Sequence, residues 1–268
     1  MAEQESRWKT AITDIAPNEI RLRGYRIDEL MGRVTFAQAI FLALTGELPS
    51  PEVGRLLDAI LVSSVDHGAV TPSTLAARTS ANTGAPLNAA IAAGVLSINR
   101  HHGGAIEDCM RLVMRVLDHA RGDENALPDA GAHVVQEYRA AGRRLPGFGH
   151  RVHTADPRTA RLFELADIAG VSGPGVRSVR LVAEALEAQT GRALPVNVDG
   201  AIAAILVDLG IAPELGNAFF IMARVPGLVA QIREEQTRER PLRAIDPRRS
   251  EYDGPPPRAI ANDDAAMG

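Results

Sequence analysis

Three histidines and one aspartate stand at breaks between helix-forming stretches, each beside a glycine. They are His67 in DHG, His102 in RHHGGA, His150 in GFGHRV and Asp199 in NVDG. Taken alone, a histidine at a helix end commonly caps carbonyl groups, and an aspartate before glycine commonly forms a turn. Here four such positions occur, and each has a neighbouring glycine, which has no side chain to fill the space. This favours the interpretation that the four residues line a shared site.

Imidazole and carboxylate groups together suit acid–base chemistry on a carbonyl compound. Removing a proton next to a carbonyl requires a carboxylate base and a hydrogen-bond donor where the enolate charge develops, and histidine supplies such a donor. Zinc sites usually need clustered ligands such as HExxH, a spacing that these histidines lack. We therefore expect no metal site.

The sequence around His150 predicts a shaped loop. Residues 145–158 read LPGFGHRVHTADPR, and the Leu-Pro-Gly start of this segment cannot continue a helix. Gly147 and Gly149 allow the backbone to come close to whatever lies opposite. Such a loop is typical of a binding site, although it does not identify the reaction.

The remaining segments that position these loops read as helices bounded by glycine or proline. Apolar residues recur at helical spacing, and convincing alternating strands and internal repeats are missing. The run 87–105 is so rich in alanine, glycine and serine that we expect a central, nearly buried helix there. The sequence therefore predicts an all-α protein, with helical runs over 35–46, 52–68, 71–84, 87–105, 106–122, 130–142, 157–170, 175–191, 199–210 and 213–236.

Composition and charge exclude several classes of protein. The 268 residues suffice for one large or two modest domains with a real core. A net charge of -4 and a pI near 6.0 give no reason to expect nucleic-acid binding. The single cysteine, Cys109, excludes an internal disulfide framework, and no uninterrupted apolar stretch reaches about 18 residues. We expect a soluble, cytoplasmic protein without membrane association, whose partners are small molecules or a second copy of itself.

Four stretches of the chain together resemble the motifs of the citrate synthase superfamily. HHGGAIE, LPGFGHRVHTADPR, PVNVDGAI and MARVPGLVAQ occur in the family's order and at its separations, and the likeness covers most of the chain. Within this superfamily the chain most resembles the stand-alone citryl-CoA lyases, which are related to the C-terminal module of ATP-citrate lyase. The DHG segment, the glycine after Asp199 and the compact length favour the lyases, whereas His102 is a feature of citrate synthases.

The resemblance implies a catalytic role for three residues. Asp199 would act as the base on the acetyl-CoA methyl group, or return a proton to the enolate during cleavage. His102 would hydrogen-bond the thioester oxygen, and His150 would donate to the oxaloacetate carbonyl or accept the citryl hydroxyl proton. Because both directions pass through an enolate or enol, these residues do not decide the direction of the reaction.

Further residues would bind the two halves of the substrate. The resemblance implies that the dicarboxylate is held by His67, Arg158 and Arg224, since the arginine fork suits carboxylates. It implies that coenzyme A, as part of the substrate and not as a tightly bound cofactor, lies against the loop of Pro146, Gly147, Phe148 and Gly149. The histidines that match no motif position are interpreted as solvent-exposed or capping residues: His101, His119, His133 and His153.

The implied activity is that of a citryl-CoA lyase, the retro-Claisen cleavage of citryl-CoA to acetyl-CoA and oxaloacetate. A citryl-CoA synthetase would then be a partner. A citrate synthase or 2-methylcitrate synthase, which condenses an acyl-CoA with oxaloacetate, fits the same residues. The alternative of another class is a non-catalytic subunit that binds CoA esters, but the presence of His102, His150 and Asp199 together speaks against it.

The resemblance also implies the citrate synthase fold, in which a smaller helical domain is inserted into a large helical domain. Residues 1–104 and 211–268 would form the large domain and residues 105–210 the small one. Closure of one domain on the other would exclude water from the thioester, with Gly103-Gly104 as a hinge.

The same likeness implies a homodimer whose active sites are completed across subunits. The small-residue runs 74–84 and 87–98 would form the interface, because facing alanines and glycines allow helices to approach closely. One departure concerns the C-terminus, where citrate synthases have an Arg-Pro-Arg motif. Asp246 stands at the nearest matching place, so one carboxylate contact is missing unless Arg248 or Arg249 replaces it.

Overall fold

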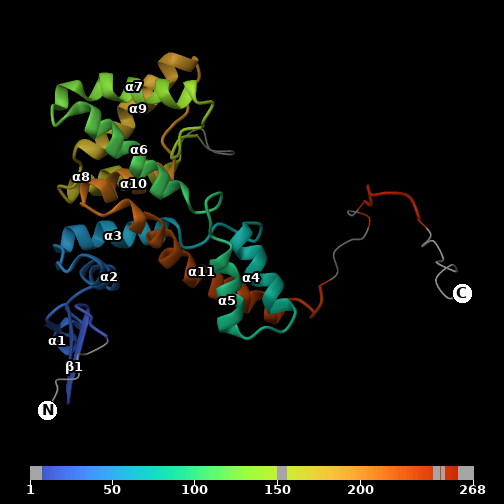
Figure 1. Ribbon diagram of the computed structural model, residues 1–268. Coiled ribbons are helices and arrows are strands. Elements are labelled where there is room, and N and C mark those ends of the chain that lie inside the picture. Colours follow the sequence, from blue (N-terminus) through green and yellow to red (C-terminus); the bar gives the residue numbers. More distant parts are fainter. Residues whose placement is uncertain (1–7, 150–155, 244–247, 249–250, 259–268) are drawn as a thin grey trace, which may run out of the picture.

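The computed structural model describes residues 8–149, 156–243, 248 and 251–258. Helices form the body of this part of the chain (Figure 1), which confirms the predicted fold class. The α-helices are α1 (Ile27–Leu30), α2 (Phe36–Thr45), α3 (Pro51–Ser63), α4 (Pro72–Asn82), α5 (Leu87–Leu96), α6 (Ala105–Ala120), α7 (Leu127–Ala140), α8 (Pro157–Ile168), α9 (Pro174–Thr190), α10 (Val198–Asp208) and α11 (Gly216–Arg238). Two short 3-10 helices are η1 (Glu124–Ala126) and η2 (Pro213–Leu215).

Proline and glycine set many of the helix ends. The first turns of α3, α4, α8 and α9 contain Pro51, Pro72, Pro157 and Pro174. Two of the predicted runs extend too far, because α3 ends at Ser63 and α5 at Leu96. The segments that follow these two ends are loops, and they carry His67 and His102.

A small antiparallel sheet precedes the helices, and the expectation that strands are missing is wrong here. The sheet consists of β1 (Thr13–Ala16), β2 (Glu19–Leu22) and β3 (Tyr25–Arg26), paired in the order β1-β2-β3. In the first pair, Thr13 lies opposite Leu22. The strands are two to four residues long and largely exposed on both faces, and polar and apolar residues alternate only in β2 (EIRL), so the pattern is too short to stand out in the sequence.

Helix α10 is the centre of the main hydrophobic core. Its residues from Gly200 to Leu206 are buried, and the helix packs against α6, α8 and α9. The same cluster includes Leu56 of α3 and Phe219 of α11. Because this central helix begins in the NVDG motif, Asp199 is held at the end of a rigid element.

The predicted burial of the alanine-rich helix is wrong for the single chain. In α5 only Ala90 and Gly94 are buried, whereas Leu87 is 47% exposed and Leu96 is 77% exposed. Gly94 lets α5 lie close to α4 and α11, since a Cβ there would be 3.0 Å from the carbonyl oxygen of Ser73. Small side chains therefore bring one face of α5 against its neighbours and leave the opposite face uncovered.

The helix over Pro213–Arg238 passes the length and hydropathy tests for a membrane span, and it alone does so within the described ranges. In the molecule, however, it packs against α3, α4, α5 and α6. It also buries Arg224 and Glu235, and Glu235 accepts a hydrogen bond of 2.7 Å from Arg78 of α4. These contacts are those of a core helix, so packing accounts for its apolar sequence.

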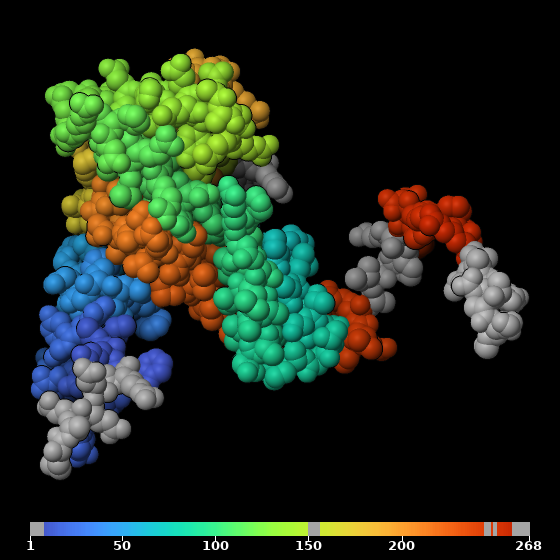
Figure 2. All heavy atoms as spheres, viewed as in Figure 1, coloured from blue at the N-terminus to red at the C-terminus, as the bar shows by residue number. Residues whose placement is uncertain are grey.

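Helices α6 to α10 gather in one half of the molecule, and α2 to α5 with α11 form the other half (Figure 1). The main core joins the halves, because it contains residues of α3 as well as α10. The division into residues 1–104 with 211–268 and residues 105–210 stays a prediction. Residues 251–258 stand clear of the body, as Figure 2 shows.

Candidate active site

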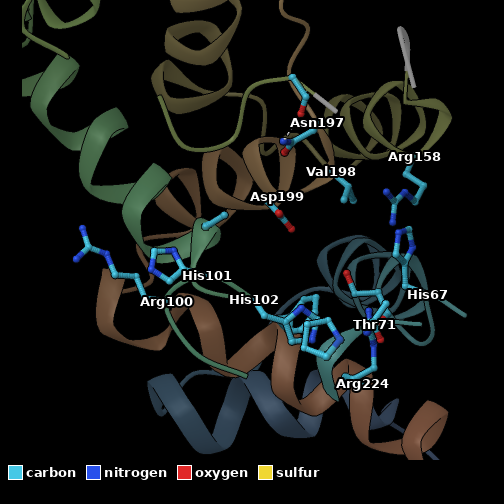
Figure 3. Close-up of a pocket in the computed structure, with 16 residues that line it drawn as sticks. His67, Thr71, Arg100, His101, His102, Arg158, Asn197, Val198, Asp199 and Arg224 are labelled. Carbon is cyan, nitrogen blue, oxygen red and sulfur yellow. Dashed lines mark hydrogen bonds between the residues drawn. The ribbon is translucent and has the colours of Figure 1, made fainter. Parts of the chain in front are cut away.

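A cavity of about 520 Å³ lies where the two halves meet. Five of the residues predicted to act in catalysis or to hold the dicarboxylate line it, namely His67, His102, Arg158, Asp199 and Arg224. Figure 3 shows these side chains around a common space. His150, the remaining predicted catalytic residue, is outside the described residues. The other lining residues are Ser64, Thr71, Pro72, Arg100, His101, Gly103, Ala105, Gly149, Asn197, Val198 and Phe220.

A tight turn presents His102 to this cavity. Asn99 and His102 exchange two backbone hydrogen bonds of 2.8 Å, and Gly103 follows with a φ of 84°. A Cβ at Gly103 would come within 2.6 Å of Ile98 and 2.8 Å of Phe220. Both the backbone conformation and the space therefore require glycine, which explains the first glycine of HHGGA.

The imidazole of His102 is anchored on two sides. Its Nε2 atom lies 2.8 Å from the hydroxyl oxygen of buried Ser73, and its ring meets that of Phe220 edge to face, with centroids 5.7 Å apart. Burial lowers the pKa of His102, and the nearby charges of Arg224 and His67 lower it further. His102 is therefore neutral near pH 7, with one ring nitrogen donating and the other accepting.

Asp199 stands, partly buried, in the first turn of α10. Asn197 caps this helix, because its Oδ1 accepts from the backbone N–H of Gly200 at 3.1 Å, while its Nδ2 donates to the carbonyl of Gly149 at 2.9 Å. Burial raises the pKa of Asp199, and the positive charge of Arg158 opposes that shift. A carboxyl group with a pKa moved towards neutrality can both take and return a proton.

Arg224 lines the cavity with a buried guanidinium group. The residue is 3% exposed, its Nε donates to the carbonyl of Ser64 at 3.0 Å, and its guanidinium carbon lies 4.7 Å from the centre of the Phe220 ring. Within the part of the chain that the structure describes, its Nη1 is buried without a hydrogen-bond partner. Leaving a buried N–H unpaired is costly, so this arrangement suits an anionic ligand.

Arg158 is fixed by the carboxylate of Asp156, the residue that caps its helix. Asp156 is buried and caps α8 by accepting from the backbone N–H of Arg158 at 3.0 Å. The same carboxylate accepts from Nε and Nη2 of Arg158 at 3.0 and 2.9 Å, and Nη1 donates to the carbonyl of Ser63 at 3.2 Å. The guanidinium is thus held in one orientation close to His67 at the edge of the cavity (Figure 3).

The loop before His150 is bonded to the segment that leads into α10. The N–H of Gly149 donates to the carbonyl of Pro195 at 2.8 Å, and the N–H of Asn197 donates to that of Gly147 at 3.0 Å. The motifs LPGFGH and PVNVDG, well separated in the sequence, therefore form one structural unit next to the cavity.

A second cavity, of about 480 Å³, adjoins the same loop, and Gly149 lines both cavities. Its wall is strongly basic, and the guanidinium carbon of Arg143 lies 4.8 Å from the centre of the Tyr138 ring. The lining residues are Arg139, Arg143, Arg144, Leu145, Phe148, Gly149, Leu186, Arg192 and Leu194. Of the four loop residues predicted to meet coenzyme A, Phe148 and Gly149 line this cavity.

Gly147→Ala is expected to lower the free energy of unfolding by about 3 kcal/mol, because it combines a left-handed backbone with overpacking. Gly147 has a φ of 85°, and a Cβ there would lie 2.5 Å from Sγ of Cys109 and 2.9 Å from Cα of Gly200. Urea denaturation measures the change. Gly122→Ala is the matched control, since Gly122 has a φ of 81° and open space around a Cβ. It should lose only about 1 kcal/mol, and equal losses in the two variants would contradict the role of crowding.

Sequence reasoning missed part of the cavity wall. Arg100 and His101 line the cavity; His101 is exposed, as the sequence predicts, but its place at the cavity is not predicted. Their position beside His102 in RHHGGA is the sequence feature that could have indicated that they line the cavity. Asn197 was also missed, and an asparagine before a helix-forming run is a recognisable N-cap.

Of the two C-terminal arginines considered as a replacement for the family's carboxylate-binding arginine, the structure describes one. Arg248 is exposed and does not line the cavity of this chain. Asp246 and Arg249 lie outside the described residues.

The fold and the cavity together define a helical acid–base site, in which a neutral imidazole, a carboxyl group and two arginines surround space for a carboxylate ligand. Residues 49–245 match the family model described as the citrate synthase C-terminal domain. The chain therefore belongs to the citrate synthase family, which confirms the resemblance drawn from its motifs.

Individual relatives extend this result. The chain is 30% identical over 225 residues to citrate synthase 2 of Bacillus subtilis, a match that covers 82% of this chain. It spans 32 to 56% of the length of the first curated relatives that it matches. The structure of citryl-CoA lyase from Hydrogenobacter thermophilus superposes with a TM-score of 0.87 at 43% identity, over 95% of this chain and 98% of that one. ATP citrate lyase from Methanosaeta concilii, solved in complex with (3S)-citryl-CoA, gives a TM-score of 0.81 at 22% identity over 94% of this chain and 42% of that one, which supports the fold alone.

Proposed function

We propose that this chain is a citryl-CoA lyase, which cleaves citryl-CoA to acetyl-CoA and oxaloacetate. The observation that carries the proposal is the cavity in which His102, Asp199 and Arg224 surround one space. The match to a citryl-CoA lyase over nearly the full length of both chains supports it. The chain spans only 56% of its citrate synthase relative, so that likeness supports a synthase less strongly.

Cleavage requires one proton to leave the citryl hydroxyl and one to reach the acetyl carbon. As the hydroxyl loses its proton, its oxygen becomes the ketone of oxaloacetate, and the electron pair of the breaking carbon–carbon bond passes to the thioester enolate. His102 donates to the thioester oxygen, where negative charge develops. Asp199, with a pKa raised by burial, returns a proton to the enolate carbon and yields acetyl-CoA. The resemblance assigns the hydroxyl proton to His150.

The arginines account for recognition of the carboxylates. Arg224 has a buried Nη1 atom for which a substrate oxygen would be the hydrogen-bond partner. Arg158 is held by Asp156 and lines the same cavity as His67. Binding a polycarboxylate between these groups would neutralise their charge and orient the bond to be broken.

The basic cavity beside the loop supports the placement of coenzyme A. Gly149 links this cavity to the one that contains Asp199, so a CoA ester could extend from one into the other. Its phosphates would meet the arginines, and its adenine would have the apolar side chains of Phe148 and Leu194. Coenzyme A enters as part of the substrate, and we propose no tightly bound cofactor.

Arg192→Ser is expected to raise KM for citryl-CoA about tenfold with little change in kcat, because a phosphate contact binds ground state and transition state alike. Steady-state release of oxaloacetate, measured against citryl-CoA concentration, gives both constants. Arg55→Ser is the matched control, since Arg55 is an exposed arginine of α3 that pairs with Glu52. A fall in kcat at unchanged KM would place Arg192 elsewhere than on the CoA phosphates.

Mass spectrometry of the products formed from citryl-CoA tests the proposed function. Acetyl-CoA with oxaloacetate is the expected result. Citrate with free CoA would instead establish the citrate synthase alternative, which His102 favours. Binding of citryl-CoA without turnover would establish the non-catalytic CoA-ester-binding subunit.

The proposal extends to assembly and location. The uncovered face of α5, with Leu87 and Leu96, supports a homodimer formed through α4 and α5, and static light scattering of the purified chain tests it. A citryl-CoA synthetase is the proposed supplier of substrate. The single cysteine, Cys109, is buried and free, which supports a reducing compartment such as the cytoplasm.

A further inference from the structure

A second group of ligand-type side chains lies on the surface formed by α6 and α7. His119 belongs to the last turn of α6, and His133 and Glu137 are one turn apart on α7. One potential ligand atom from each of the three lies within 4.8 Å of the other two. None of the three lines either cavity described above, so the proposed reaction does not account for them.

The spacing of these atoms approaches that of a metal shell. Two ligands at about 2.0–2.1 Å from a tetrahedral zinc ion are about 3.4 Å apart. Nε2 of His133 lies 3.6 Å from Oε1 of Glu137. The rings of His119 and His133 stand 4.7 Å apart between centroids at an angle of 69°. Small rotations of these exposed side chains would bring one nitrogen of each ring to a common ion.

The carboxylate of Glu137 is already oriented by a neighbour. Its Oε2 atom accepts a hydrogen bond from Nη2 of Arg115, which leaves Oε1 facing His133. Ligating carboxylates are commonly held in this way by a second hydrogen bond. The positive charge of Arg115 also reduces the attraction for a cation, so we expect micromolar rather than tighter affinity.

We propose that His119, His133 and Glu137 bind a divalent transition-metal ion of the zinc type, with water completing a tetrahedral shell. Imidazole with one carboxylate selects such ions over magnesium or calcium, which require more oxygen ligands. The ion would fasten the C-terminal end of α6 to α7. Because α6 begins directly after the turn that carries His102 and is about 24 Å long, this is a structural site remote from the reacting atoms.

Isothermal titration of the full chain, freed of purification tag and metal, with zinc chloride tests this proposal. We expect one zinc ion per chain with micromolar affinity. His119→Ala and His133→Ala should each weaken binding at least tenfold. Asp118→Asn, which alters an exposed carboxylate in the same turn of α6 as His119, is the matched control and should bind zinc as the unaltered chain does. Circular dichroism verifies that the variants fold.

The unfolding temperature distinguishes zinc binding at this site from zinc binding by the histidines of the cavity. Zinc should raise the unfolding temperature of the unaltered chain by several degrees and have no such effect on His133→Ala. Zinc binding that survives unchanged in both histidine variants would place the ion at another site and overturn the proposal. The absence of saturable binding up to millimolar zinc would overturn it as well.

Discussion

Asp199→Asn is expected to lower kcat for citryl-CoA cleavage by roughly 10³ or more while leaving binding of the CoA ester nearly unchanged. The amide keeps the shape of the carboxyl group but cannot hold the proton that the enolate carbon must receive. Asp199 stands at the start of the buried helix α10, and burial raises the pKa of its carboxyl group. Single-turnover cleavage measures the chemical step, and calorimetric titration with citryl-CoA measures binding.

A matched variant separates loss of the proton donor from a general loss of charge. Asp129→Asn removes an exposed carboxylate from the first turn of α7 and should retain full activity. If Asp199→Asn kept even a tenth of the original turnover, another group would be the acid, and the assignment of Asp199 would fail. Loss of binding together with turnover would indicate that the carboxylate shapes the site instead.

Much of the candidate site could be predicted because its residues share a visible signal. His67, His102 and Asp199 each stand beside a glycine at a helix break, and the structure brings all three to one cavity. Two of these glycines are required by close contacts, because a Cβ at Gly103 would meet Ile98 and Phe220, and a Cβ at Gly200 would meet the backbone of Gly147; Gly68 has open space around it and a φ of 79°. Local sequence therefore carries information about which backbone segments must approach one another closely.

Other features depend on contacts that no local pattern encodes. Among the described residues Nη1 of Arg224 has no hydrogen-bond partner, because the side chain is buried over the Phe220 ring and faces the cavity, and the sequence shows only an arginine in an apolar run. The pairing of His119 with His133 is set by the angle at which α6 meets α7. Such groupings require the tertiary structure, because residues on two helices share no spacing along the chain.

In the alanine-rich helix α5, the small residues correctly predict close packing, but the inference that the helix is buried is wrong for the single chain. Small residues in α5 do indicate close packing, as Gly94 against Ser73 demonstrates. Close packing on one face does not imply burial on the other, and Leu96 remains 77% exposed in the single chain. A high content of small residues indicates how closely a helix packs against its neighbours. How many of its faces are buried depends on all the elements and subunits around it.

His102→Ala is expected to lower kcat by roughly 10² to 10³, the usual effect of removing a donor to a developing oxyanion. The neutral imidazole contacts Ser73 through Nε2 and Phe220 through its ring, so its orientation is fixed before the substrate arrives. KM should change much less than kcat, because the enolate charge exists only after the carbon–carbon bond begins to break. Steady-state cleavage of citryl-CoA measures both constants.

Ser73→Ala tests whether that orientation matters. The serine does not line the cavity, and its hydroxyl meets Nε2 of His102 at 2.8 Å, so it is a positioning residue. Its loss should lower kcat about tenfold, less than the loss of His102 itself, with KM little changed. Ser80→Ala, on the same helix α4, should keep the original rate. If His102→Ala cleaved citryl-CoA at the original rate, the oxyanion would be stabilised by another group, and Arg100 or His101 on the cavity wall would be examined in its place.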